Sequence, residues 1–364
     1  MKYTDHLLSS NPFDFTTVSE NLFVKSFQEM ALHHYNHNSY FKFIWDNKKI
    51  HPKDILSEKD LERVPMILVN QFKEHDFKSS ENIVLTLGSS GTSGQRSVQH
   101  LDQYSLDNVK KLAFKIHDQL GMVDKQKYNY LCFTYDPEVA NDLGTAFTDE
   151  LLTSFTQVNE IYYTFQFDKQ IDDFKMNVKE VVETLKRFEL SPYPTRILGF
   201  PAFLNEIVDE FDLKLNLGDD SWIQTGGGWK SKADEEIPKD EFRIKMSKAL
   251  GLPKENIRDL FGMVEHGIPY VDCSEGKLRI PNYSRVFIRD PKTLEILPHG
   301  EIGLIQFLCS YNSSYPAMSI LTTDWGCVHL EGDSTSSLSL EIKGRAGVSK
   351  NKGCALKALE VARG

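Results

Sequence analysis

The sequence predicts an α/β protein whose mainly parallel sheet is flanked by helices and joined to a smaller β-rich part. From residue 83 to residue 260, strand-like and helix-like segments alternate, as they do in parallel sheets connected by crossover helices. Beyond about residue 270, short strand-like segments follow one another between Pro, Gly and Asp residues. Because 40% of the 364 residues are hydrophobic and 26% are charged, the chain has the composition of a globular protein with a sizeable core.

The first 80 residues are expected to form a helical and irregular layer. Residues 18–35 carry apolar positions at helical spacing, and residues 54–63 predict a charged helix. The alternating part predicts strands at 83–87, 128–135, 161–165, 195–199, 222–225 and 257–260, and helices at 105–120, 141–155, 171–188, 201–211 and 240–250. Strands at 285–289, 303–309 and 318–321 predict a smaller antiparallel sheet or barrel packed on the first body. We therefore expect an N-terminal layer (1–80), a core (81–330, β-rich from about 270) and a short C-terminal segment (331–364).

Charge and cysteine content argue against several classes of protein. The net charge of -10 disfavours attraction to nucleic acid, and no basic block is interleaved with aromatic residues. No apolar stretch approaches the ~18 residues of a membrane span, and no secretory signal follows Met1, so we expect a cytoplasmic protein. The five cysteines are widely spaced, which favours reduced thiols over a disulfide framework. A zinc site made of His266, Cys273, Cys309 and Cys327 is disfavoured because no two of these ligands are closely spaced.

A glycine-rich loop after the first predicted strand is a candidate phosphate-binding site. Residues 83–87 are apolar enough for a buried strand, so the loop would leave a strand end, where ligands collect in α/β folds. Gly88, Gly91 and Gly94 allow backbone N–H groups to turn inward, and Arg96 supplies positive charge. The hydroxyl donors of this loop are Ser89, Ser90, Thr92 and Ser93. Its spacing differs from that of the common NTPase P-loop, and a flexible Ser/Gly linker is the alternative.

A second glycine-rich segment follows the strand predicted at 222–225. Gly226, Gly227 and Gly228 would permit a flat ligand such as a base to lie against the backbone, with Trp222 or Trp229 nearby. The same three glycines are equally consistent with a plain strand-to-helix turn.

Two acidic residues follow other predicted strands. Glu265 comes after an aromatic residue and a glycine just beyond the strand at 257–260, and its carboxylate would suit Mg²⁺. Asp324, after Thr322 and Thr323, would suit two vicinal ribose hydroxyls. The alternatives are a solvated loop acid at 265 and a turn-forming aspartate at 324.

Taken in this order, the segments resemble the motifs of the adenylate-forming superfamily, which includes acyl-CoA synthetases and luciferase-like ligases. Residues 89–96 are similar to its phosphate loop, 225–228 to its adenine-wall glycines, 261–265 to its aromatic-Gly-x-Thr-Glu motif, 322–324 to its Thr-Gly-Asp motif and 344–345 to its hinge Gly-Arg. Within the superfamily, the chain most resembles the acyl-protein synthetase (LuxE) family, which neighbours the phenylacetate-CoA ligases. Two features carry this resemblance: the short segment after Gly344-Arg345, and Cys354 close to the end, where this family has an acylated cysteine.

The resemblance implies an adenylate-forming N-terminal domain, with the mobile C-terminal domain of ordinary members strongly truncated. It also implies an acid–thiol ligase that uses ATP and Mg²⁺ to convert a long-chain fatty acid to acyl-AMP and then acylates Cys354. The acyl-protein would pass to a fatty acid reductase, in a complex that can include an acyltransferase. The implied catalytic residues are Arg96, Glu265 (also the Mg²⁺ ligand), His266 and Cys354, and the implied ATP- or AMP-binding residues are Ser89, Ser90, Gly91, Thr92, Ser93, Gly94, Gly226, Gly227, Gly228, Phe261, Gly262, Asp324 and Arg345.

Three departures from the family pattern leave other functions open. Gln95-Arg96 stands where relatives usually have Pro-Lys, and Val264 replaces the Thr that commonly precedes the motif glutamate. The lysine of the C-terminal domain has no counterpart unless Lys350 or Lys352 compensates. From the residues alone, the neighbouring lysines favour a reactive Cys354 thiolate, and packing in a C-terminal helix is the alternative. A phenylacetate-type or fatty acyl-CoA or carrier-protein ligase, or a degenerate nucleotide-binding subunit, are the competing functions.

Overall fold

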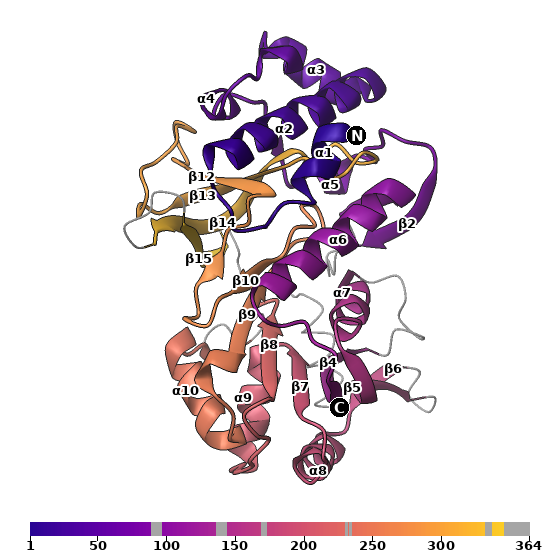
Figure 1. The fold of residues 1–364 in the computed structure, drawn as a ribbon, viewed down its shortest axis with the longest axis vertical. Helices are drawn as coiled ribbons and strands as arrows, with labels where there is room; N and C mark the ends of the chain where they lie inside the picture. Colours follow the sequence, from indigo (N-terminus) through magenta and orange to yellow (C-terminus); the bar gives the residue numbers. More distant parts are fainter. Residues whose placement is uncertain are drawn as a thin grey trace.

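The computed structural model describes residues 1–88, 97–135, 144–168, 173–229, 232, 235–331 and 337–345, without the side chains of 144–146, 167, 168, 173 and 174. Its elements form one large mixed sheet, a small two-stranded sheet and helices on both faces (Figure 1). None of the helices in the described part of the chain is both long and apolar enough to cross a membrane.

The first 80 residues are mainly helical. They contain α1 (Lys2–Leu7), α2 (Thr17–His37), α3 (Ser39–Asn47), the 3₁₀ turn η1 (Pro52–Asp54), α4 (Glu58–Leu61), β1 (Ile67–Leu68) and α5 (Gln71–Glu74). The single charged helix predicted at 54–63 is wrong, because Ile55 is extended and Ser57 starts a new short helix. The Asp60 carboxylate accepts a hydrogen bond from the Ser57 amide at 2.9 Å, so a capping box fixes that start.

The first predicted strand is present but is not part of the parallel sheet. β2 (Ile83–Gly88) pairs antiparallel with β3 (Val98–Asp102) in a separate sheet, and Gly88 is the register partner of Val98. The expectation of a buried strand is wrong, since Val84 is 55% exposed while Leu87 is buried. The glycine-rich segment therefore joins the two strands of a hairpin rather than a strand and a crossover helix. The helix α6 (Gln103–Gln119) begins directly after β3.

The central part has the predicted parallel order. It contains β4 (Lys127–Tyr135), α7 (Gly144–Thr153), β5 (Gln157–Asp168), β6 (Asp173–Met176), α8 (Val178–Glu189), β7 (Thr195–Gly199), α9 (Pro201–Glu210), β8 (Trp222–Gly226), α10 (Lys239–Leu250), η3 (Lys254–Asn256) and β9 (Ile257–Phe261). Strands β5, β4, β7, β8 and β9 are neighbours in this order and run parallel. The helix predicted at 171–188 begins only at Val178, because residues 173–176 pair antiparallel with β5 and Asn177 caps the helix.

The β-rich part continues the same sheet instead of forming a second one. Its strands are β10 (Tyr270–Asp272), β11 (Leu278–Arg279), β12 (Ser284–Arg289), β13 (Gly303–Cys309), β14 (Ser319–Leu330) and β15 (Leu338–Arg345). The sheet order is β12-β13-β14-β15-β11-β10-β9-β8-β7-β4-β5-β6, and β1 pairs in parallel with β14. A separate sheet or barrel is therefore wrong, because the hydrogen bonds of β10 to β9 join the antiparallel strands to the parallel ones.

Side chains that alternate along the strands fill cores on both faces of the parallel part. On β4, Tyr130 and Cys132 belong to the core that includes helices α2 and α6, whereas Leu131 and Phe133 belong to the core that includes α8, α9 and α10. This alternation is the period-2 geometry of a strand covered on both sides. The sheet thereby fixes the ends of β8 and β9 between two packed layers. The domain boundaries expected at residues 80 and 330 stay predictions.

Candidate functional site at the ends of β8 and β9

The predicted adenine-wall glycines lie beside the predicted aromatic-glycine segment. β8 and β9 are parallel, with Thr225 opposite Asp259 and Gly226 opposite Leu260. The carboxyl ends of both strands therefore meet at one edge of the sheet, where α/β proteins bind ligands. Gly227 and Gly228 have φ angles of 74° and 68°, in the left-handed region that favours glycine.

The two tryptophans expected near these glycines pack against other side chains. Trp222 starts β8, at the opposite end of the strand, and the guanidinium of Arg258 lies 4.8 Å from its ring centre. Trp229 is buried against Phe242, with ring centres 6.1 Å apart. Trp222 is separated from the glycines by the length of β8, and the Trp229 ring packs against α10, so proximity in sequence does not show that either ring faces the glycines.

Asp259 is a polar group at this edge that the sequence analysis did not single out. The Thr225 hydroxyl donates a hydrogen bond to its Oδ1 at 3.0 Å, and its own amide donates to Oδ2 of Asp272 at 2.8 Å. Burial raises the pKa of Asp259 and the charge of Asp272 adds to this, while the Lys239 ammonium opposes it. The signal in the sequence is an acidic residue inside a predicted strand that leads into a motif segment.

The end of β9 and the residues that follow it place an aromatic ring and a histidine against Phe307 of β13, and an acid near Tyr315. Phe261 stacks on Phe307 of β13, with ring centres 5.9 Å apart, and His266 stacks on the same ring at 4.8 Å. Glu265 is buried, and its charge adds to burial in raising the pKa of Tyr315. Phe307 of β13 therefore packs against the end of β9 and is paired in the sheet with Ile320 of β14. The Glu265 carboxylate is a suitable ligand for Mg²⁺, and Mg²⁺ binding by Glu265 stays a prediction.

His266 is a buried neutral imidazole. Its Nε2 lies 2.9 Å from the hydroxyl of Tyr270, and burial lowers its pKa to about 3. Its Nδ1 is buried and has no hydrogen-bond partner within the described parts of the chain. An unsatisfied buried ring nitrogen is uncommon and is available to a ligand group that can reach it.

Asp324 and Arg345, predicted separately for ribose binding and for the hinge, meet as cross-strand partners of β14 and β15. The Arg345 Nε donates a hydrogen bond to Oδ1 of Asp324 at 3.0 Å. The Asp324 amide donates to the Thr322 hydroxyl at 3.1 Å, and that hydroxyl donates to the Ile305 carbonyl. Gly344, with φ 128°, lies at a register shift of this strand pair. The acid is thus held in a fixed position while Arg345 stays largely exposed.

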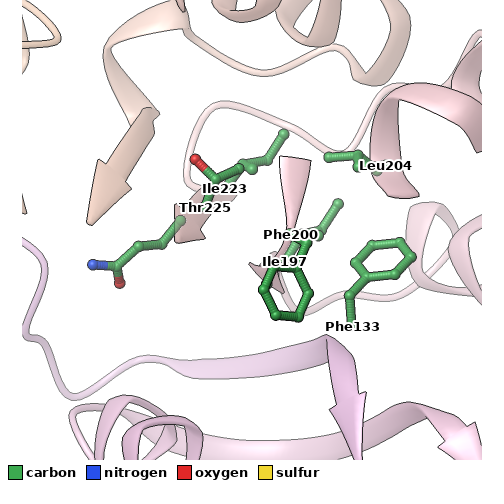
Figure 2. A pocket seen from close by; sticks show the side chains of 8 residues that line it. Phe133, Ile197, Phe200, Leu204, Ile223 and Thr225 are labelled. Carbon is green, nitrogen blue, oxygen red and sulfur yellow. The ribbon is translucent and has the colours of Figure 1, made fainter. Parts of the chain in front are cut away.

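An apolar recess adjoins Thr225 (Figure 2). It lies between β4, β7, β8 and α9 and has no room for a water molecule. The residues that line it are Phe133, Ile197, Gly199, Phe200, Leu204, Ile223, Gln224 and Thr225. Small-molecule sites are typically ~300–1,000 Å³, so a long acyl chain needs more room than this recess offers.

Several predicted residues lie outside the part of the chain that the structure describes. These are Ser89, Ser90, Gly91, Thr92, Ser93, Gly94, Arg96, Lys350, Lys352 and Cys354. Among the described residues, His266, Cys273, Cys309 and Cys327 do not come together as one group of potential metal ligands.

Comparison with known proteins gives the family and the fold. The acyl-protein synthetase LuxE family model matches residues 1–361. The long-chain-fatty-acid–luciferin-component ligase of Aliivibrio fischeri is 28% identical over 346 residues, covering 93% of this chain and 88% of that protein. The ligase of the same name from Vibrio harveyi is 26% identical over 330 residues, covering 89% and 83%.

The fold is similar to that of a solved acyl-CoA ligase. The 2-hydroxyisobutyryl-CoA ligase in its postadenylation state, in complex with R3-HIB-AMP, has a TM-score of 0.68 at 12% identity. The likeness covers 92% of this chain and 69% of that one, and it shows a fold shared with the N-terminal domain of adenylate-forming ligases. Since the family match extends over residues 1–361, the chain belongs to the LuxE acyl-protein synthetase family.

Proposed function

We propose that the protein activates a long-chain fatty acid with ATP and Mg²⁺ and transfers the acyl group to its own Cys354. In the first step a carboxylate oxygen of the fatty acid attacks the α-phosphorus of ATP, so that the acyl-AMP anhydride forms and pyrophosphate leaves. In the second step the Cys354 thiolate attacks the acyl carbonyl carbon, the thioester forms and AMP leaves. The thiol proton passes to solvent before the attack.

The observation that carries the proposal is the meeting of two motif segments at one sheet edge, in a chain of this family. Thr225 and Gly226 lie opposite Asp259 and Leu260 because β8 and β9 are parallel neighbours, and the chain continues from there into residues 227–228 and 261–262. We assign Gly226, Gly227 and Gly228 to the adenine, with Phe261 and Gly262 on the adjoining segment. This edge is where open α/β sheets bind nucleotides.

The remaining roles follow the chemistry of the side chains. Asp324 accepts one hydrogen bond from Arg345 and has lone pairs left for the two ribose hydroxyls. Glu265 would hold Mg²⁺, which offsets charge on the phosphate oxygens as pyrophosphate leaves. The loop of residues 89–96, with Arg96, would bind the β- and γ-phosphates. His266 would line the acyl-carboxylate site as a neutral group, because burial keeps its pKa far below 7.

The proposal extends to what consumes the product. A cysteine thioester is an activated acyl group, and its reduction by a hydride donor yields an aldehyde and regenerates the thiol. We therefore propose a fatty acid (acyl-protein) reductase as the partner, with an acyltransferase as a further member of the complex.

The experiment follows activation and transfer separately. The protein is incubated with MgATP and a series of radiolabelled fatty acids, with and without CoA, and label bound to the polypeptide is tested for release by hydroxylamine. ATP–pyrophosphate exchange is measured in parallel. We expect exchange and a hydroxylamine-labile label, and Cys354→Ser is expected to keep the exchange while losing the label.

Cys273→Ser is the matched control, because Cys273 is a half-buried free thiol elsewhere in the chain. Cys273→Ser should keep both the ATP–pyrophosphate exchange and the hydroxylamine-labile label. Label that persists in Cys354→Ser would contradict Cys354 as the acceptor, and label that moves to CoA would indicate a CoA ligase. Binding of ATP without exchange would indicate a nucleotide-binding subunit without ligase activity.

A further inference from the structure

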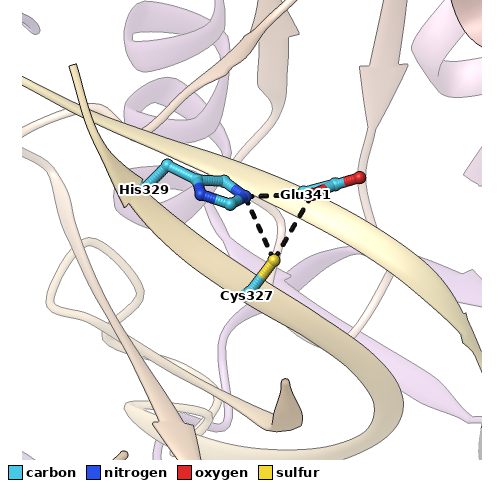
Figure 3. A group of neighbouring side chains, drawn as sticks. All are labelled: Cys327, His329 and Glu341. Carbon is cyan, nitrogen blue, oxygen red and sulfur yellow. Dashed lines mark hydrogen bonds and ion pairs between the residues drawn. The ribbon is translucent and has the colours of Figure 1, made fainter. Parts of the chain in front are cut away.

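We propose that Cys327, His329 and Glu341 form a binding site for Zn²⁺ or a similar borderline-soft divalent cation on the β14–β15 strand pair (Figure 3). The three side chains offer one sulfur, one imidazole nitrogen and one carboxylate oxygen, which are the ligand types that zinc binds. Among the described residues, this is a group of three potential ligand atoms that all lie within 4.8 Å of one another. The site is separate from the nucleotide site proposed above and does not depend on that function.

The strand geometry explains why the three ligands converge. Cys327 and His329 are two residues apart on β14, so their side chains emerge on the same face of the sheet. Glu341 is the register partner of Cys327 on β15, which places its side chain directly across the ladder. The two strands are hydrogen-bonded on both sides of this pair, so the ligands come from a rigid element rather than a loop.

The ligand atoms are already close to a metal-binding arrangement. Nε2 of His329 lies 3.1 Å from Sγ of Cys327 and 2.9 Å from Oε2 of Glu341, and Sγ lies 3.4 Å from that Oε2. Tetrahedral coordination at zinc bond lengths separates such atoms by roughly 3.3–3.6 Å, so shifts of a few tenths of an ångström accommodate the ion.

The two carboxylate oxygens of Glu341 have different neighbours. Lys343 donates a hydrogen bond to Oε1 of Glu341 at 2.5 Å, while Oε2 faces Cys327 and His329. This hydrogen bond orients the carboxylate in the manner of an outer-shell partner of a metal ligand. The His329 and Glu341 side chains are 41% and 47% exposed, so an ion can enter from solvent and a water molecule can complete its coordination.

Binding changes the protonation of the thiol but requires no other reactant. The metal takes the sulfur as thiolate, the sulfur–metal bond forms, and the thiol proton leaves to solvent. The bound ion would replace the hydrogen bonds of Cys327 and His329 with Glu341 and would tie β14 to β15 a few residues from Asp324 and Arg345.

The test titrates the full-length, reduced protein with Co²⁺ as the spectroscopic probe, followed by displacement with Zn²⁺. We expect one equivalent of Co²⁺ to produce a sulfur-to-cobalt charge-transfer band with tetrahedral d–d absorption, and Zn²⁺ to abolish both. Cys327→Ser should remove the charge-transfer band. His329→Ala should weaken binding by about 100-fold or more, beyond the 10–100-fold typical of outer-shell changes.

Cys273→Ser is the matched control and should titrate like the unaltered protein. His329→Ala alters an exposed side chain, so its fold should be intact by circular dichroism even if Cys327→Ser is destabilised. A missing charge-transfer band in the unaltered protein would overturn the proposal. So would a band that survives Cys327→Ser, or an unchanged affinity in His329→Ala.

Discussion

The β8–β9 edge and the β14–β15 pair assemble their polar groups in opposite ways. At the first, parallel strands end together, so residues of two short contiguous segments meet, as Thr225 does with Asp259. At the second, antiparallel strands run past each other, so Asp324 meets Arg345 and Cys327 meets Glu341. The first arrangement is visible as glycine-rich motifs in the sequence, while the second exists only once the register of the ladder is set.

The two regions also differ in their exposure to water. His266, after β9, is 1% exposed, whereas the side chains of His329 and Arg345 on the strand pair are 41% and 63% exposed. Buried polar groups carry large desolvation costs, and exposed charges carry small ones. Changes in protonation should therefore alter stability strongly at buried His266 and weakly at exposed His329, unless a metal ion binds His329.

The titration of buried histidines on acidification should produce the largest effect of any single side chain, and two of these histidines lie next to β8 and β9. Burial lowers the pKa of His117, which contacts Gln224 of β8, to about 4 and that of His266 to about 3, from an ordinary value of 6.5. The unfolded chain binds these protons first, so the contribution of each histidine to stability is full above pH 6.5 and is lost as the pH drops towards its folded-state pKa. At pH 5 each histidine should cost about 2 kcal/mol.

Urea unfolding at pH 7 and pH 5, compared between the unaltered protein and a variant, isolates this loss from the opposite contribution of Asp149 and Asp259, whose pKa values burial raises. His117→Gln cannot titrate in this range and should reduce the difference between the two pH values by about 2 kcal/mol. His329→Gln, on the exposed strand pair, is the matched control. If His117→Gln and His329→Gln reduced the stability difference between pH 7 and pH 5 equally, the proposed difference between buried and exposed histidines would be contradicted.

Substitution of Asp324 should give the next largest effect, on nucleotide binding rather than on the fold. If its carboxylate holds the ribose hydroxyls, Asp324→Ala removes charged hydrogen bonds worth about 1.5–3 kcal/mol, or a 10–100-fold loss of ATP affinity. Calorimetric titration with ATP measures this change in affinity. Glu341→Gln removes one carboxylate from the same strand pair and should leave the affinity unchanged, so a similar loss in both variants would contradict the ribose assignment.

A smaller effect should come from adding a methyl group at the β8 end. Gly228 has φ 68° and no atom within 4 Å of an added Cβ, so Gly228→Ala is penalised by backbone conformation alone. We expect a loss of about 1–2 kcal/mol in the free energy of unfolding. Gly262→Ala lacks the positive φ and should be better tolerated. Equal losses in the free energy of unfolding for Gly228→Ala and Gly262→Ala would contradict an energetic cost of the left-handed conformation at Gly228.

The strands of the parallel part were predictable because their apolar runs are short, β-branched and bounded by turn residues. β7 has the predicted limits, 195–199, and β8 and β9 differ from theirs by one residue each. The errors occur where tertiary pairing overrides local pattern: residues 173–176 join β5, and β2 pairs with β3 in its own sheet. A hydrophobic period does not say which partner a strand will find.

The sequence by itself determined the alternating α/β core, the glycine-rich segments at strand ends and the resemblance to the LuxE family, because these depend on contiguous residues. Only the tertiary structure decided that the antiparallel strands extend the parallel sheet, that Asp259 bonds to Thr225 and that Glu341 faces Cys327 and His329. The physical reason is that cross-strand neighbours are set by register, and register depends on hydrogen bonds between segments far apart in the chain.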